Sequence, residues 1–309
     1  LLHLPQATTL SFAYAVSAIV GFVVIFILFS KRFGRILKLQ IDIKEWQRVF
    51  SLSWPLALSG IFALIYTYTD TVMLGFWKVF EQIGYYNAAQ KIIALAIFPA
   101  ALIITAFLPA FSRYSETDKQ KTQTIFHYQN LVLLALAFPI VCGGYILANG
   151  LILHFYGANY LPAVLALKIL LLMAGISYFS TSLGYALFVF NQQKKAFWAY
   201  LIGALLNVPL NAFLIPKYGF YGAAIATVIT AFITFLVLVY LVKRNTPLKL
   251  INWFFIKYLL IIILATALMS LVLVFGAKYN FNVVLKVLGG GLVYLVIIGG
   301  FLLKSKDII

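Results

Sequence analysis

The sequence predicts an all-α membrane protein, a polytopic transmembrane helix bundle of about nine spans. Hydrophobic residues make up 64% of the 309 residues, charged residues make up only 10%, and the mean hydropathy is +1.04. Soluble domains are about 45–50% apolar and about 25% charged, so lipid must cover much of this surface. The apolar residues also gather in long runs, and most of the basic residues lie between these runs.

The individual spans follow from length. About 20 apolar residues cross a hydrocarbon core of about 30 Å as a helix, and a helix pairs all of its own backbone groups in lipid. The stretch 196–242 is interrupted only by Ile215–Gly219, so we expect a helical hairpin with a tight turn there. The third and fifth runs are long enough to tilt or to extend beyond the bilayer. In order, the predicted spans are residues 10–29, 50–76, 85–111, 126–148, 162–190, 196–215, 221–242, 255–276 and 284–303.

The distribution of lysine and arginine predicts the orientation in the membrane. Most of these 23 residues lie in alternate connections, at 31–48, 113–121, 194–195, 243–257 and 304–306. Basic connections face the cytoplasm, so we expect the N-terminus outside and the C-terminus inside. The net charge of +16 then reflects topology. The basic residues form no continuous stripe, and we expect no nucleic-acid partner.

Enzyme and metal signatures are sparse in this sequence. The single cysteine, Cys142, lies in an apolar run and excludes an intrachain disulfide, and the three histidines are scattered without ligand spacing. No Walker A motif, nucleophile elbow or paired acidic motif is present. We therefore predict no enzyme activity, cofactor or metal site. A signal peptide is not predicted either, because no charged segment precedes the first apolar run.

Two charged residues within spans are the main candidates for function. Asp70 lies about two turns from the outer end of the second run, and Lys91 lies about two turns from the same end of the third. We expect adjacent antiparallel helices to place them at similar depth, where they either pair with each other or face a water-filled cavity. In the functional interpretation Lys91 binds an anionic group and Asp70 modulates it. Lys168 is the next candidate, although its ammonium group is expected to reach the outer headgroups.

Uncharged polar residues within the apolar runs give a weaker signal. Asn207 and Asn211 are four residues apart and share one helix face, and a similar stripe runs through Ser177, Thr181 and Tyr185. Such residues either hydrogen-bond neighbouring helices or line a sugar-binding cavity. The expected substrate-binding set is Lys91, Asp70, Tyr66, Asn87, Gln90, Asn207 and Asn211.

Five stretches of the sequence together resemble a known transporter family. In this order they are similar to the polysaccharide biosynthesis (Wzx-type, O-antigen) flippases of the multidrug/oligosaccharidyl-lipid/polysaccharide (MOP) superfamily. The resemblance covers about residues 48–245. The stretches are Leu52–Leu58 followed by Asp70–Gly75, Ile83–Ile92, Phe107–Arg113, Phe155–Tyr160, and Asn211–Gly219 followed by Gly222–Thr227.

The resemblance implies a fold of two six-helix lobes around a central cavity, with two helices added at the C-terminus of some members. In that frame residues 1–49 are the last helix of a first lobe plus a cytoplasmic interlobe loop. Residues 50–245 are the six-helix second lobe, and residues 246–309 are the two added helices. The missing N-terminal lobe would then be a partner of this chain, which alone would not enclose the cavity.

The resemblance also implies an activity. Members move an undecaprenyl-diphosphate-linked oligosaccharide to the outer leaflet of the bacterial inner membrane, and Lys91 matches a basic cavity residue of related flippases. The implied partners are the lipid-linked oligosaccharide, membrane lipids and a coupling cation. Alternatives are a cation-coupled multidrug antiporter, an exporter of sporulation or peptidoglycan precursors, a membrane-embedded glycan-modifying enzyme and a membrane scaffold.

Overall fold

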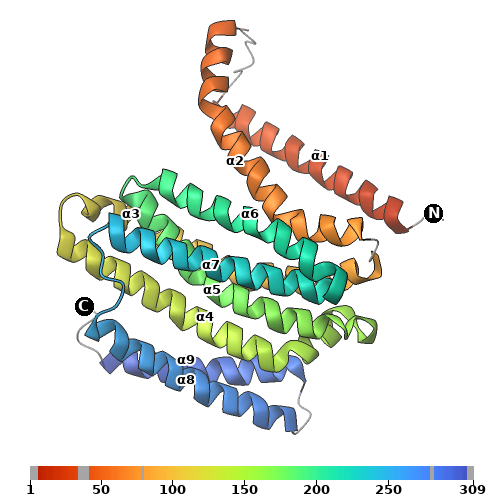
Figure 1. Ribbon diagram of the computed structural model, residues 1–309, viewed down its shortest axis with the longest axis vertical. Coiled ribbons are helices and arrows are strands. Elements are labelled where there is room, and N and C mark those ends of the chain that lie inside the picture. The colour runs from red at the N-terminus through yellow and green to blue at the C-terminus, as the bar shows by residue number, and fades with distance from the viewer. Residues whose placement is uncertain (1–5, 34–41, 78–79, 279–281, 305–309) are drawn as a thin grey trace. The chain divides into compact units, whose positions relative to one another are not determined.

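The computed structural model describes residues 6–33, 42–77, 80–278 and 282–304, and side chains for 12–32, 42–50, 68–77, 81–276 and 282–300. Within these ranges the chain is helical and contains no strand (Figure 1). A short 3-10 turn, Ala158–Tyr160, precedes α5. The helices are α1 (Gln6–Phe33), α2 (Ile43–Phe76), α3 (Phe80–Ser115), α4 (Lys119–Tyr156), α5 (Ala163–Val189), α6 (Gln193–Tyr218), α7 (Phe220–Asn245), α8 (Trp253–Lys278) and α9 (Val283–Lys304).

The helices confirm the predicted class, a multi-span helical membrane protein. Eight segments within the described residues are long and apolar enough to cross a membrane. The longest helices are α3 and α4, with 36 and 38 residues, whereas α5 has 27. At about 1.5 Å per residue, α5 still exceeds a hydrocarbon core of about 30 Å, as predicted for the fifth span. Helix α4 is longer than the predicted fourth span. Helix α4 begins in polar sequence, where the Asp118 carboxylate accepts hydrogen bonds from the amides of Gln120 and Lys121.

The chain divides into two compact units, residues 1–63 and 64–309. The first unit contains α1 and the first part of α2. The described side chains of α1, residues 12–32, are exposed. An apolar helix with an exposed surface is compatible with lipid contact.

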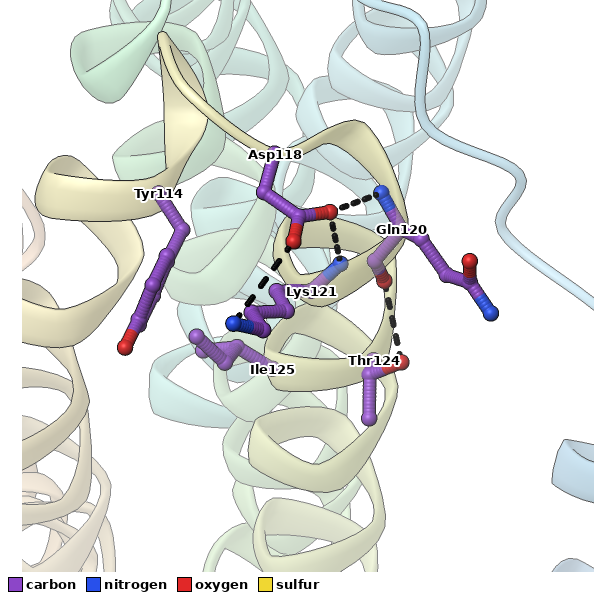
Figure 2. A pocket seen from close by; sticks show the side chains of 6 residues that line it. All are labelled: Tyr114, Asp118, Gln120, Lys121, Thr124 and Ile125. Atoms are coloured by element: carbon purple, nitrogen blue, oxygen red, sulfur yellow. Dashed lines mark hydrogen bonds and ion pairs between the residues drawn. The ribbon is translucent and has the colours of Figure 1, made fainter.

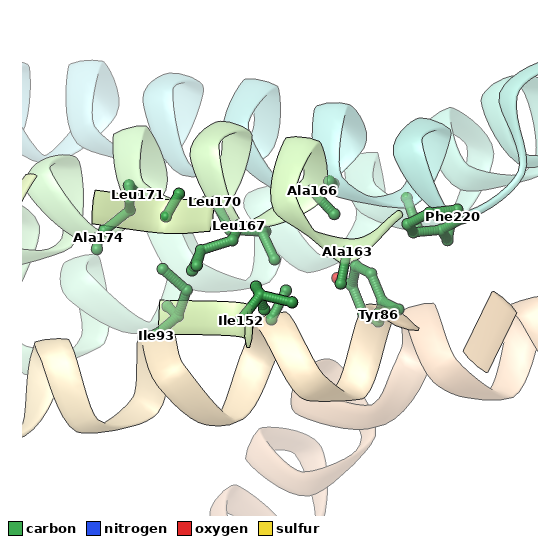
Figure 3. Close-up of a cluster of buried hydrophobic side chains, with 14 of the residues drawn as sticks. Tyr86, Ile93, Ile152, Ala163, Ala166, Leu167, Leu170, Leu171, Ala174 and Phe220 are labelled. Carbon is green, nitrogen blue, oxygen red and sulfur yellow. The ribbon is translucent and has the colours of Figure 1, made fainter. Parts of the chain in front are cut away.

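Within the second unit, α5 is the central helix. It packs against α3, α4 and α7, while α6 pairs with α7 (Figure 1). The largest buried cluster joins these helices through Leu167 and Leu170 of α5, Ile93 of α3, Ile152 of α4 and Phe220 of α7 (Figure 3). This apolar cluster holds α3 and α7 at fixed positions beside α5.

A single residue forms the turn between α6 and α7. Gly219 has a φ of 56°, in the left-handed region that glycine adopts without steric cost. The predicted break at Ile215–Gly219 was therefore too wide, because α6 continues through Pro216. The side chain of Gln82 on α3 accepts a hydrogen bond from the Phe220 amide at 3.1 Å, which pairs one of the free N–H groups at the start of α7.

Helices α8 and α9 form a pair that packs against α4. The Gln123 side chain on α4 accepts from the Lys249 amide at 2.7 Å and donates to the Lys249 carbonyl at 2.8 Å. The Tyr294 hydroxyl on α9 donates to the Ala135 carbonyl on α4 at 2.6 Å. These bonds attach the C-terminal helix pair to the same unit that contains α3–α7.

Replacing Gly222 by alanine tests the close approach of α6 and α7. A Cβ atom at Gly222 would lie 2.6 Å from the Leu214 carbonyl carbon and 3.0 Å from the Ile215 nitrogen. These are backbone atoms that cannot rotate away. We expect Gly222→Ala to destabilise the protein by about 1–3 kcal/mol and to lower the midpoint of thermal unfolding in detergent.

Gly289 on α9 offers a matched control, because it is exposed and a Cβ there would meet nothing within 4 Å. Gly289→Ala should leave the midpoint unchanged or raise it, since alanine favours helix over glycine by about 1 kcal/mol. An unchanged midpoint for Gly222→Ala would contradict the close approach.

Candidate functional site

Four polar residues of the second unit lie at the same distance from two helix turns. Asp70 and Tyr86 stand eight residues before and after position 78, the midpoint of the α2–α3 connection. Asn211 and Thr227 stand eight residues before and after Gly219, the α6–α7 turn. Eight helical residues rise about 12 Å, so antiparallel packing brings the four side chains to one depth.

These side chains meet at the carboxylate of Asp70. Its Oδ2 accepts hydrogen bonds from the Tyr86 hydroxyl on α3 and from Thr227 Oγ1 on α7, the latter at 2.6 Å. Its Oδ1 accepts from Asn211 Nδ2 on α6 at 2.6 Å. Asp70 is only 4% exposed. Four helices, α2, α3, α6 and α7, therefore share one buried carboxylate, and all of these atoms belong to the second unit.

A second layer of amides surrounds the carboxylate. Asn211 Nδ2 also donates to Asn207 Oδ1 at 2.8 Å, and Asn207 Nδ2 lies 3.5 Å from Thr230 Oγ1 on α7. Asn211 Oδ1 is buried and accepts no hydrogen bond from the described atoms. An unpaired buried oxygen is costly, so a donor or a cation at this position would stabilise the cluster.

The cluster has the chemistry of a site for a monovalent cation or a proton. Within the described part of the chain no ion pair includes Asp70, and an ionised carboxylate without a counter-charge costs several kcal/mol when buried. Its neighbours Asn207, Asn211 and Thr227 carry further oxygen atoms, the ligands that hard cations take. A bound cation or proton would balance the single negative charge.

Lys91 does not join this cluster, so of the two alternatives for Asp70 and Lys91 the structure does not show the ion pair. Lys91 lies 13 residues from position 78, compared with eight for Asp70, so it is about 7.5 Å deeper along the helix axis. It also projects about 140° around α3 from Tyr86 and is exposed. The expectation of similar depth failed because the two residues are not equally distant from the turn.

Asn87 and Gln90 lie between the buried cluster and Lys91. Thr71 Oγ1 on α2 donates to Asn87 Oδ1 at 3.1 Å, and Gln90 Nε2 donates to the Tyr86 hydroxyl at 2.8 Å. Both amide side chains are half-buried. Asn87 is one helical turn from Lys91 and shares its face of α3.

The remaining predicted residues contribute elsewhere. The side chain of Tyr66 lies outside the described residues. The hydroxyls of Ser177 and Thr181 bond carbonyls of their own helix, at Met173 and Ser177. Lys168 is half-buried, and its ammonium lies 4.7 Å from the centre of the Tyr145 ring.

Sequence reasoning did not single out Tyr86 and Thr227 as site residues. Neither is charged, and tyrosine and threonine are common in membrane helices, so composition alone gives no signal. The equal distance of Asp70 and Tyr86, and of Asn211 and Thr227, from their turns is a signal that could have found them. Equal distances bring the two side chains to the same depth only if the helices on each side of a short turn run antiparallel.

A surface hollow of about 510 Å³ lies at the other end of α3 (Figure 2). Tyr114 is 28 residues beyond Tyr86, roughly 42 Å along the helix. The Asp118 carboxylate in this hollow already caps α4, and it pairs with Lys121 Nζ at 3.8 Å. The hollow is lined by Tyr114, Asp118, Gln120, Lys121, Thr124 and Ile125.

The fold and the buried carboxylate together define a multi-span helical membrane protein with an ionisable group buried among its helices. The chain belongs to the polysaccharide biosynthesis protein family, whose model matches residues 6–165, just over half of the chain. The resemblance read from the sequence is thereby confirmed. A relative from Haloferax volcanii, named probable flippase AglR, is 29% identical over 194 residues, which cover 62% of this chain and 39% of the relative.

Solved structures share the fold. The lipid II flippase MurJ in an inward closed conformation has a TM-score of 0.70 at 24% identity, over 86% of this chain and 57% of that protein. An outward-facing multidrug resistance MATE family transporter of the MOP superfamily has a TM-score of 0.57 at 20% identity, over 74% of this chain and 53% of that protein. This chain thus spans about two-fifths to three-fifths of the proteins it matches.

Thr227→Val tests whether the threonine hydroxyl stabilises the Asp70 carboxylate. Valine keeps the shape but removes a donor, so we expect a loss of about 1–3 kcal/mol of stability, measured by thermal unfolding in detergent. In an Asp70→Asn background the loss should be smaller, because the hydrogen bond is no longer charge-assisted.

Thr122→Val is the matched control, since Thr122 is buried and its hydroxyl bonds the Asp118 carbonyl of α4. Its cost should be the same in both backgrounds. Equal costs of Thr227→Val with and without Asp70 would argue against the interaction.

Proposed function

We propose that this chain forms the second lobe of a flippase that moves a lipid-linked oligosaccharide from the cytoplasmic to the outer leaflet for surface polysaccharide synthesis. The carrier would be a polyprenyl diphosphate, undecaprenyl diphosphate if the cell is bacterial. The observation that carries the proposal is the buried Asp70 cluster with exposed Lys91 nearby on α3, in a polysaccharide biosynthesis protein.

The names of similar proteins support this substrate class. The matching family is described as polysaccharide biosynthesis protein, and AglR is named a probable flippase. MurJ, whose fold is shared, is named a lipid II flippase. A lipid-linked glycan is the substrate class that fits these names together with an exposed lysine in a membrane span.

Lys91 would contact the diphosphate. A diphosphate and sugars lose their hydration when they enter hydrocarbon, which is strongly unfavourable without compensating contacts. The ammonium of Lys91 supplies positive charge, and Asn87 and Gln90 beside it carry amide groups that can bond phosphate or sugar hydroxyls. The apolar tail can remain in the bilayer while the polar head passes along this face.

Asp70 would hold a coupling cation, with Asn207, Asn211 and Thr227 as oxygen donors. The unpaired oxygen of Asn211 supports this role, since a cation would satisfy it. Ionisable residues within membrane spans commonly mark ion pathways. Binding of the cation would neutralise the buried carboxylate and so favour one arrangement of the four helices over another.

The second candidate is a cation-coupled multidrug antiporter. The same Asp70 cluster favours it, and a MATE family transporter shares the fold. Lys91 argues against it for cationic drugs, because an exposed ammonium repels them. The two candidates differ in the charge of the cargo, which makes them separable by experiment.

We propose that the whole protein has the organisation that the resemblance implies. Residues 1–49 would belong to a first lobe and its connection, residues 50–245 to the second lobe, and residues 246–309 to two added helices. An N-terminal lobe would complete the cavity. The distribution of Lys and Arg supports a plasma-membrane orientation with the C-terminus in the cytoplasm.

Depletion of the natural protein that contains this sequence tests the function. Lipid-linked repeat units should accumulate on the cytoplasmic leaflet, and surface polysaccharide should be lost, because unaided crossing of hydrocarbon by the diphosphate is strongly unfavourable. The measurement is the accessibility of the glycan at the outer surface of spheroplasts. Unchanged export combined with new sensitivity to cationic drugs would favour the antiporter.

Complementation with Lys91→Ala in the same cells separates the role of Lys91 from the fold. Surface polysaccharide should fall at least tenfold, while the amount of protein in the membrane stays unchanged, because Lys91 is exposed. Lys217→Ala is the control, since Lys217 is exposed at the end of α6, with its ammonium 4.0 Å from the Phe213 ring centre. Normal polysaccharide with Lys91→Ala would rule out the role of this lysine.

A further inference from the structure

Two successive residues of α2 pair with two successive residues of α3. The inner contact joins Asp70 to Tyr86, and the outer contact joins Thr71 to Asn87. The inner contact is buried, whereas the outer contact is half-buried. The contact between α2 and α3 therefore contains paired polar groups, and not apolar side chains alone, on the side that leads towards Lys91.

Tyr86 is held rigidly within this region. Its ring is 1% exposed and packs in the buried apolar cluster near Ala163 and Phe220 (Figure 3). A ring packed in this way cannot swing to a new position without opening the core. Only its hydroxyl proton is free to reorient. The phenol ring is therefore fixed in position, and its single hydroxyl proton can point to different acceptors.

Gln90 connects the Tyr86 hydroxyl to the exposed face of α3. It lies about 40° around the helix from Tyr86, whereas Asn87 and Lys91 lie about 100° and 140° away. Ala94 and Phe98, which follow on the same exposed face, are open to the surroundings. Gln90 thus stands at the border between the buried cluster and the surface that carries Lys91, and its amide is the donor to the Tyr86 hydroxyl at 2.8 Å.

We propose that the Tyr86 hydroxyl and Gln90 form a hydrogen-bond link that reports occupancy of the Asp70 site to the Lys91 face of α3. The proposal rests on the proposed function, since it assumes a cation at Asp70 and an anionic substrate at Lys91. Tyr86 is a positioning residue in this scheme and contacts no substrate.

The link works because the Tyr86 hydroxyl stands between Asp70 Oδ2 and the Gln90 amide. In the structure Tyr86 donates to Oδ2 and accepts from Gln90 Nε2 at 2.8 Å. A cation held at Oδ2 would compete for the lone pairs that accept this hydrogen bond, and the phenol proton would then turn to another acceptor. The Gln90 amide supplies that acceptor if it turns to present Oε1.

The experiment measures two quantities in the natural protein that contains this sequence, reconstituted in liposomes. The first is the rise in unfolding midpoint with sodium or potassium, which reports occupancy of the Asp70 site. The second is the ratio of lipid-linked oligosaccharide transport with and without the effective cation, which reports coupling. Gln90→Leu should keep the first quantity, because every described hydrogen bond to Asp70 stays in place, and its transport ratio should fall at least threefold towards one.

Two variants make this result specific. Tyr86→Phe removes the phenol hydroxyl from the link and should also reduce the ratio. Because this variant also removes a donor to Asp70, occupancy of the cation site is measured in Gln90→Leu. Tyr178→Phe is the control, because Tyr178 is equally buried and its hydroxyl donates to the Ala96 carbonyl at 2.7 Å. Tyr178→Phe should keep the wild-type ratio.

A wild-type ratio in both Tyr86→Phe and Gln90→Leu would overturn the link. Loss of the cation-induced midpoint shift in Gln90→Leu would also overturn it, because Gln90 would then belong to the cation site itself. A wild-type protein that transports without any response to these cations would instead refute the cation site. Failure of transport to depend on Lys91 would refute the proposed substrate face.

Discussion

The burial of one carboxylate among the apolar helices of the second unit is the constraint on which the rest of this structure depends. An ionised Asp70 could not remain there without donors, because the surroundings supply no water to replace its hydration. Tyr86, Asn211 and Thr227 provide these donors from three different helices. The requirement to solvate a single residue therefore fixes the mutual positions of α2, α3, α6 and α7.

The same constraint connects the fold to the proposed transport. The hydrogen bonds that hold the four helices together converge on a group whose charge changes when a proton or cation binds. Occupancy of the site therefore alters the interactions between α3 and its neighbours, and α3 also carries Lys91 on its exposed face. A helical unit built in this way can favour one conformation with the cation bound and another without it. Transport across a membrane requires such a change of conformation.

Much of the fold could be predicted from the sequence because lipid leaves few alternatives. Runs of apolar residues had to be helices, and charge in the connections predicts an orientation, which stays a prediction. The site was only partly predictable. Asp70, Asn207 and Asn211 were identifiable as polar groups in apolar runs, but the expectation that Asp70 and Lys91 lie at similar depth was wrong. Pairing depends on depth and on the face of the helix, and a charge pattern along the sequence specifies neither of these for Tyr86 or Thr227.

Direct measurement of cation binding to the purified natural protein tests the central claim, that Asp70 is the centre of a cation or proton site. Binding of radioactive sodium and uptake of protons should be compared between the wild type and Asp70→Asn under matched conditions. The account predicts one sodium ion or one proton bound per chain at this site, and loss of that binding in Asp70→Asn. Equal binding by the two proteins, or no binding by the wild type, would contradict it.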